Sequence, residues 1–124
     1  LGLGLDDGPL DLMQAVLEGV AFRAAEVLRA MDAAVPLQGA VSVDGGLTKN
    51  PYFVQFLADG LGRGLERQDE PEVTAFGTAL LAGEPLGAPV PPASPRHETT
   101  PQPGGAERCA KFANAVSLAR QWRP

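Results

Sequence analysis

Apolar residues near the start of the chain recur at alternating spacings of three and four. This spacing predicts one long amphipathic helix over residues 9–31. The apolar stripe on that helix comprises Leu10, Met13, Leu17, Val20, Ala24, Val27 and Met31. Pro9 suits the first turn of a helix, and Asp11 in the same turn complements the helix dipole. Residues 32–36 finish in a proline and are expected to end the helix.

A short apolar run at residues 39–43 has no helical period, which predicts a strand. The sequence Asp-Gly-Gly at 44–46 breaks this run sharply. Asn50 and Pro51 then predict the start of a second helix, because asparagine caps a helix and proline fits its first turn. That helix would present Phe53, Val54, Phe56, Leu57 and Leu61 on its apolar face and end at Gly60 or Gly62.

Residues 65–67 predict another short strand, and a third helix is predicted over residues 74–83. This helix is dense in small residues, namely Ala75, Gly77, Thr78, Ala79 and Ala82. Small side chains let a helix approach a sheet or a ligand closely, and the glycine costs about 1 kcal/mol in helix propensity. The order helix, strand, helix, strand, helix predicts the α/β class.

Composition changes after the third helix, where seven prolines occur, at positions 85, 89, 91, 92, 95, 101 and 103. Such a segment is typical of a linker or an extended surface segment without a core of its own. A last helix is predicted over residues 106–122 and is expected to dock on the main body through Phe112, Val116, Leu118, Ala119 and Trp122. We therefore expect three parts: a partial domain at 1–86, a linker at 87–105 and a C-terminal helix at 106–124.

The chain has 124 residues and a net charge of −5, with scattered basic residues, which argues against binding nucleic acid or anionic membranes. The sequence has no pattern of a signal or transit peptide and no apolar run of about 18 residues. Cys109 is the only cysteine, which fits a reducing cytoplasm, and it is expected to be a small, half-buried side chain on a helix. His97 stands alone in the proline-rich segment and cannot form a zinc site without further ligands.

The two glycines Gly45 and Gly46 lie between a predicted strand and a helix start. They leave the backbone bare, and the free N–H groups of the helix start favour a phosphate or a polar heterocycle. Asn50 offers a carbonyl and an amide at the same place. This is a credible nucleotide site, although a plain turn with Asn50 as a helix cap explains the same residues. It is not a Walker loop, because no Gly-Lys-Ser or Gly-Lys-Thr is present and Lys49 precedes the helix.

Four stretches of the sequence carry a resemblance to known families. Residues 41–48, Val-x-Val-x-Gly-Gly-x-Thr, resemble the adenosine motif of the actin-like ATPase superfamily. Residues 2–22, 44–59 and 72–83 resemble, in order and spacing, the C-terminal part of the FGGY carbohydrate kinases. Within that family, the residues of these stretches most resemble those of the glycerol kinase branch. The resemblance covers most of residues 2–86.

The resemblance implies a ribonuclease-H-like domain, with ATP bound in the cleft between two such domains. Gly45 and Gly46 would pack near the α-phosphate and ribose of ATP, and Asn50 would contact the adenosine. The bend at these glycines must then be bare and face a groove beside the third helix. Glu18 lies in the family signature and is expected to have a structural role. The whole protein would transfer the γ-phosphate of ATP to a hydroxyl of glycerol or a related polyol or sugar.

The resemblance also implies what the chain does not contain. The general base, the sugar pocket and the Mg²⁺ site would lie upstream, so we expect no catalytic residue and no metal site here. Asp6 and Asp7 read as a solvated turn, and Asp44 as a residue that orders its own turn. The opening strands of the domain are also missing, which would leave an exposed strand edge and a possible homo-oligomer. The alternative is a non-catalytic module, derived from such a kinase, that binds a nucleotide or a partner.

Overall fold

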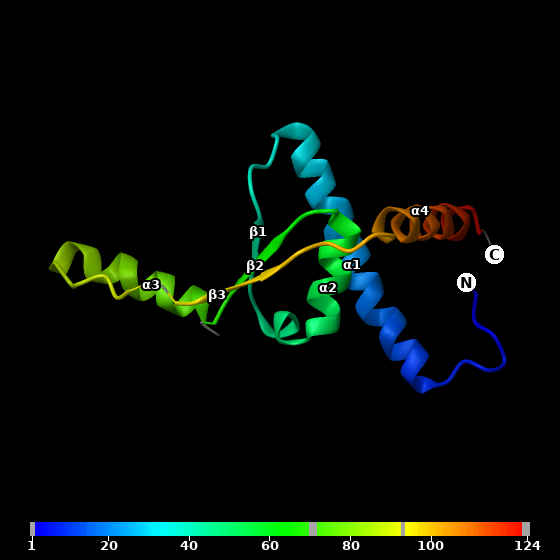
Figure 1. The fold of residues 1–124 in the computed structure, drawn as a ribbon, viewed down its shortest axis with the longest axis horizontal. Helices are drawn as coiled ribbons and strands as arrows, with labels where there is room; N and C mark the ends of the chain where they lie inside the picture. Colours follow the sequence, from blue (N-terminus) through cyan, green and yellow to red (C-terminus); the bar gives the residue numbers. More distant parts are fainter. Residues whose placement is uncertain (1, 70–71, 93, 123–124) are drawn as a thin grey trace.

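The computed structural model describes residues 2–69, 72–92 and 94–122. The elements in chain order are α1 (Pro9–Ala34), β1 (Val41–Val43), the 3₁₀-helix η1 (Gly46–Lys49), α2 (Pro51–Leu61), β2 (Leu65–Gln68), α3 (Val73–Gly83), the 3₁₀-helix η2 (Glu84–Leu86), β3 (Arg96–Thr99) and α4 (Gly105–Gln121). Figure 1 shows α3 and α4 at opposite ends of the long axis, with α1, α2 and the sheet between them. All four predicted helices and both predicted strands are present, within a few residues of the expected bounds.

The sheet has the strand order β1-β2-β3. β1 and β2 are parallel, with Val41 opposite Leu65 and Val43 opposite Arg67. This parallel pair is possible because α2 provides the crossover connection between the two strands. β3 pairs antiparallel with β2, with Thr99 opposite Leu65. One edge of β1 has no strand beside it among the described residues.

β3 lies inside the segment that was expected to be a linker. The described residues of this segment are largely exposed, but residues 96–99 pair with β2 at four register positions. The prediction missed this strand because an exposed edge strand needs no apolar residues. Its sequence, Arg-His-Glu-Thr, gives no alternation of apolar and polar positions.

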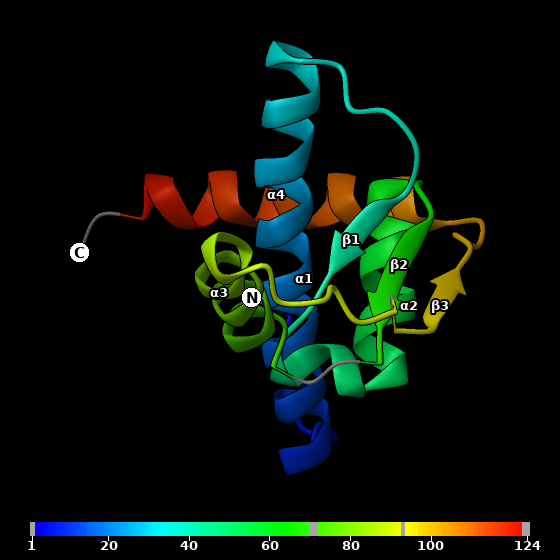
Figure 2. The same cartoon turned by 90° about the vertical axis from the view of Figure 1, so that its left-hand side faces the viewer.

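The core lies between α1, α2 and one face of β1 and β2 (Figure 2). Its buried members are Ala21, Ala25, Phe53, Val54, Phe56, Leu57, Ala58 and Leu65. Ala21 and Ala25 lie where α1 meets α2, and their small side chains let the two helices approach closely. Burial of each phenylalanine contributes roughly 1.5–3 kcal/mol, so α2 is the best anchored helix.

The predicted apolar stripe of α1 is real but mostly exposed. Leu10, Met13, Val20, Val27 and Met31 are between 44% and 79% exposed. The face that α1 buries instead carries Ala21 and Ala25. Spacing predicts that a helix has an apolar face, but it does not say whether this chain supplies what covers that face.

α4 docks on the body, as predicted. The ring of Phe112 stacks on Phe22 of α1 with 4.5 Å between the centroids. The Arg108 guanidinium lies 4.8 Å from the ring centroid of Phe56, and Cys109 is 7% exposed, so it is more buried than expected. Figure 2 shows α4 crossing α1. The C-terminal helix is therefore part of the same core.

Candidate functional site

The two-glycine bend that follows β1 has an open backbone. Gly45 has a φ of 93°, a conformation that favours glycine. A Cβ atom at Gly45 or at Gly46 would meet no other atom within 4 Å. The bend is held from behind by Thr48, which is 8% exposed and whose Oγ1 donates to the Gly45 carbonyl at 2.7 Å. A ligand could therefore lie directly against the main chain, as the sequence predicts.

Asn50 is the N-cap of α2, and this part of the prediction is confirmed. Its side-chain Oδ1 accepts hydrogen bonds from Tyr52 N at 3.0 Å and Phe53 N at 3.3 Å. Both bonds use the carbonyl oxygen, so the amide Nδ2 is the donor left for a ligand. The contact of Asn50 with adenosine stays a prediction, as do those of Gly45 and Gly46 with the nucleotide.

A network of three side chains joins α1 to the first turn of α2, and the sequence analysis did not predict it. Tyr52 Oη donates to Glu18 Oε1, and Gln14 Nε2 lies within hydrogen-bonding distance of both Tyr52 Oη (2.9 Å) and Glu18 Oε1 (2.8 Å). Burial of the Tyr52 hydroxyl, followed by its hydrogen bond to Glu18 and the charge of that carboxylate, raises the pKa of Tyr52. The structural role expected of Glu18 is consistent with this contact. The spacing of four between Gln14 and Glu18 was the available signal.

A hollow of about 250 Å³ lies between η1, α2 and the strands β2 and β3. Lys49, Arg67 and His97 bring basic groups to its wall, but Gly45, Gly46 and Asn50 do not line it. His97 Nε2 lies 2.6 Å from Asp69 Oδ1, a contact that the sequence did not predict. Asp69 also lies 3.7 Å from Arg67, so it offsets part of the basic charge of this wall.

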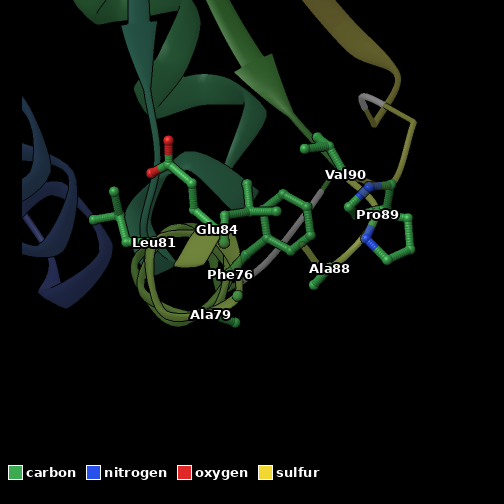
Figure 3. A pocket seen from close by; sticks show the side chains of 10 residues that line it. Phe76, Ala79, Leu81, Glu84, Ala88, Pro89 and Val90 are labelled. Carbon is green, nitrogen blue, oxygen red and sulfur yellow. The ribbon is translucent and has the colours of Figure 1, made fainter. Parts of the chain in front are cut away.

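A larger cavity, of about 470 Å³, lies away from the bend, between α3, η2 and residues 88–91. Figure 3 shows Phe76 of α3 beside Pro89 and Val90 on its wall. Size alone does not make this the functional site, because its lining is mostly apolar and comes from one local stretch of the chain, residues 76–91. α3 buries none of its residues and extends away from the sheet (Figure 1). Neither hollow joins the bend to α3, so among the described residues the groove expected beside the third helix is not seen.

The two acidic turn residues Asp7 and Asp44 have different surroundings. Asp7 Oδ2 accepts from Gly4 N at 2.6 Å, which fits the predicted turn before α1. Asp44 is exposed and, among the described residues, makes no side-chain hydrogen bond, so the expectation that it orders its own turn is wrong. Over residues 2–69, 72–92 and 94–122, no group of three or more His, Cys, Asp or Glu could hold a metal ion.

Comparison with known proteins defines the class to which this fold and bend belong. The C-terminal domain of the FGGY family of carbohydrate kinases matches residues 1–84. The chain therefore belongs to this family. It is 43% identical over 89 residues to a glycerol kinase of Ectopseudomonas mendocina and 40% identical over 88 residues to one of Cereibacter sphaeroides. These matches cover 69% of the chain and 18% of each relative.

Solved structures confirm the predicted fold class, an α/β part of a ribonuclease-H-like domain. The xylulose kinase from Rhodospirillum rubrum aligns with a TM-score of 0.74 and 22% identity, over 96% of this chain and 26% of that one. The Plasmodium falciparum glycerol kinase with ADP aligns with a TM-score of 0.71 and 21% identity, over 100% of this chain and 26% of that one. In the part of this chain that the structure describes, no helix is both long and apolar enough to span a membrane.

Proposed function

We propose that this chain is the C-terminal, nucleotide-holding portion of an ATP-dependent kinase for glycerol or a related polyol or sugar. The observation that carries the proposal is the bare bend at Gly45 and Gly46, placed between β1 and α2 in a member of the FGGY family. The chain spans 18% of the length of the glycerol kinases named above, so the other elements of the reaction belong to a longer polypeptide.

Three residues of this chain would hold ATP. The backbone at Gly45 and Gly46 leaves room for the ribose and α-phosphate, because no atom would obstruct even an added Cβ. Asn50 would donate from Nδ2 to the adenosine while its Oδ1 caps α2. ATP supplies the γ-phosphoryl group, and this chain's part is to bind and orient the nucleotide.

The described residues do not fit a magnesium site, because they offer no cluster of metal-binding side chains. We place the magnesium ion, the general base and the sugar pocket in the longer polypeptide, and we expect the isolated chain to be inactive. We also place the protein in the cytoplasm. The one cysteine, Cys109, is free and buried, and a reducing compartment would keep it so.

The test of this proposal is an activity assay. The chain is expressed joined to the polypeptide encoded upstream of it, and ATP consumption is measured with glycerol and with pentuloses. The expected result is ATP-dependent phosphorylation of at least one of these compounds, and none by the 124-residue chain alone. Failure of the longer protein to consume ATP with any polyol or sugar would refute the kinase assignment.

The second candidate is a non-catalytic module that binds a nucleotide or a partner chain. The lack of a metal-binding cluster in the described residues and the open edge of β1 favour it. A start codon directly before this segment in the genome would support the module. A reading frame that continues upstream through a catalytic aspartate would exclude it.

A further inference from the structure

We propose that Tyr52 and Glu18 are positioning residues for the nucleotide: together they fix the first turn of α2, and with it the amide of Asn50, against α1. This inference rests on the proposed function, in which Asn50 contacts the adenosine. It goes further by assigning the orientation of Asn50 to a second helix, through side chains that touch no ligand themselves.

Tyr52 belongs to two sets of hydrogen bonds at once. Its backbone N–H donates to Asn50 Oδ1 at 3.0 Å, which is half of the cap. Its side-chain hydroxyl donates to Glu18 Oε1 on α1, and Gln14 Nε2 lies 2.9 Å from the same hydroxyl. Tyr52 therefore links the capping side chain to α1, through one hydrogen bond at its backbone and others at its hydroxyl.

The first two residues of α2, Pro51 and Tyr52, have little else to hold them. Pro51 and Tyr52 are exposed, whereas the buried residues of α2 begin at Phe53. The ring of Tyr52 has one aromatic neighbour among the described residues, Phe56, with 5.9 Å between the centroids. Within the part of the chain that the structure describes, the side-chain hydrogen bonds from these two residues to α1 are those of the Tyr52 hydroxyl.

The chemistry of the network suits a fixed position. A hydroxyl that donates to a carboxylate forms a charge-assisted hydrogen bond, which is roughly twice as strong as a neutral one. Gln14 also donates to Glu18 Oε1 at 2.8 Å, so a residue of the same helix helps to fix the carboxylate that accepts from Tyr52. The amide Nδ2 of Asn50 then points in a direction set by α1 and α2 together, because Oδ1 cannot turn away without loss of the cap.

The experiment uses the longer kinase and the variants Y52F, E18A and E18Q. Y52F removes only the hydroxyl and keeps the ring, and E18A removes the acceptor. Each is expected to raise the KM for ATP about fivefold, the effect of one lost hydrogen bond, with kcat and the KM for the polyol changed less than about twofold. E18Q keeps an acceptor oxygen and is expected to restore most of the affinity. The double variant Y52F/E18A should be no worse than Y52F, since both break the same bond.

Two controls separate the possible outcomes. E26A removes another carboxylate of α1, one paired with Arg23, and is expected to leave the KM for ATP unchanged. N50A tests the proposed function itself. If N50A raises the KM for ATP and Y52F and E18A do not, the positioning role is wrong and the nucleotide site stands. If N50A has no effect although ATP is consumed, the assignment of the nucleotide site fails and the positioning role fails with it.

A second measurement applies to the 124-residue chain, whatever the yield of the longer variants. Amide hydrogen exchange at Tyr52 and Phe53 reports directly on the cap, since both N–H groups donate to Asn50 Oδ1. Y52F is expected to speed exchange at these two amides several-fold and to leave the amides of α4 unchanged. Equal exchange in Y52F and the parent chain would overturn the proposal without reference to ATP.

Discussion

At the scale of single residues, Asp59 fastens the C-terminal segment to α2. It is 7% exposed, and its Oδ1 accepts from Gln102 N and Gln55 Nε2, both at 2.7 Å. Its Oδ2 accepts from Arg108 at 2.8 Å. Burial by itself would raise the pKa of this carboxyl, but these hydrogen bonds and the charge of Arg108 outweigh burial and lower it. Asp59 is therefore charged in the folded chain and stabilises it.

The lowered pKa of Asp59 sets the direction of the pH dependence. The stabilisation is complete above the unfolded pKa of about 3.9 and is lost as the pH falls through the lower folded value. We expect D59N to lower the free energy of unfolding at pH 7 by about 2 kcal/mol and to flatten its decline below about pH 4. Urea unfolding between pH 7 and pH 3 measures both effects. E107Q is the control, because Glu107 and its partner Lys111 are both exposed and water screens their pairing. A pH slope equal in D59N and the parent chain would contradict the account.

A substitution at Gly46 can distinguish a nucleotide site from a plain turn. A methyl group there would meet nothing within 4 Å, and Gly46 is not among the glycines with positive φ. We expect G46A to leave the free energy of unfolding within about 0.5 kcal/mol of the parent value. The same methyl would occupy the face proposed for the ribose and α-phosphate.

The measurement for G46A is a nucleotide titration followed by calorimetry or by amide chemical shifts. The isolated chain is expected to bind ATP with a Kd no tighter than about 1 mM, or about −4 kcal/mol, because it forms one wall of the site. G46A should weaken this binding further at unchanged stability. G19A serves as the control, since Gly19 lies in α1 and its added methyl also meets nothing within 4 Å. Unchanged ATP affinity in G46A would favour the plain turn.

The sequence predicts contacts between residues that are close along the chain. It does not predict contacts between residues that are far apart along the chain. The Asn50 cap spans two or three residues, so its pattern is visible locally. The bond of Tyr52 to Glu18 spans 34 residues and that of Asp59 to Gln102 spans 43. Such contacts depend on how the helices pack, and no local pattern contains that information.

At the scale of elements, the N-terminus of α4 lies against the C-terminal end of α2. A methyl group on Gly105 would overlap the carbonyl of Asp59 and crowd the N–H of Gly60. We expect G105A to lower the free energy of unfolding by about 2–3 kcal/mol, because backbone atoms cannot move aside without loss of the packing between the helices.

Urea unfolding checks the prediction for G105A, with G19A again as the matched control. G19A should raise the stability by up to about 1 kcal/mol, since alanine is the better helix former and its methyl meets open space. A G105A chain as stable as the parent would mean that α4 does not rest on α2 in solution.

Elements were predictable where they are amphipathic and not where they are exposed. α2 carries a cap, a proline at its start and Gly62 in the left-handed conformation at its end, and the sequence contains each of these signals. β3 carries none, because its partner is the backbone of β2. α3 was predicted as a helix of small residues. Those residues do not indicate that the helix lies away from the sheet.

At the scale of the whole molecule, the chain has its own core around α2 and several surfaces that it does not cover. One edge of β1 has no described neighbour, α3 buries no residue, and most of the stripe on α1 faces solvent. The membership in the FGGY family was predictable because its motifs are local and keep their order. The arrangement of α3 was not, since the groove expected beside it requires surroundings that this chain does not supply.

The two-sided character of α1 bears on how mutational data from this chain are to be read. Ala21 and Ala25 face the core, so replacing them changes the chain itself. Val27 and Met31 lie outside that face and are 60% and 51% exposed, so polar replacements there would pass unnoticed in a survey of the 124-residue chain. The same replacements would be damaging in any assembly that buries these residues. Tolerance to mutation measured on the 124-residue chain therefore does not apply to such an assembly.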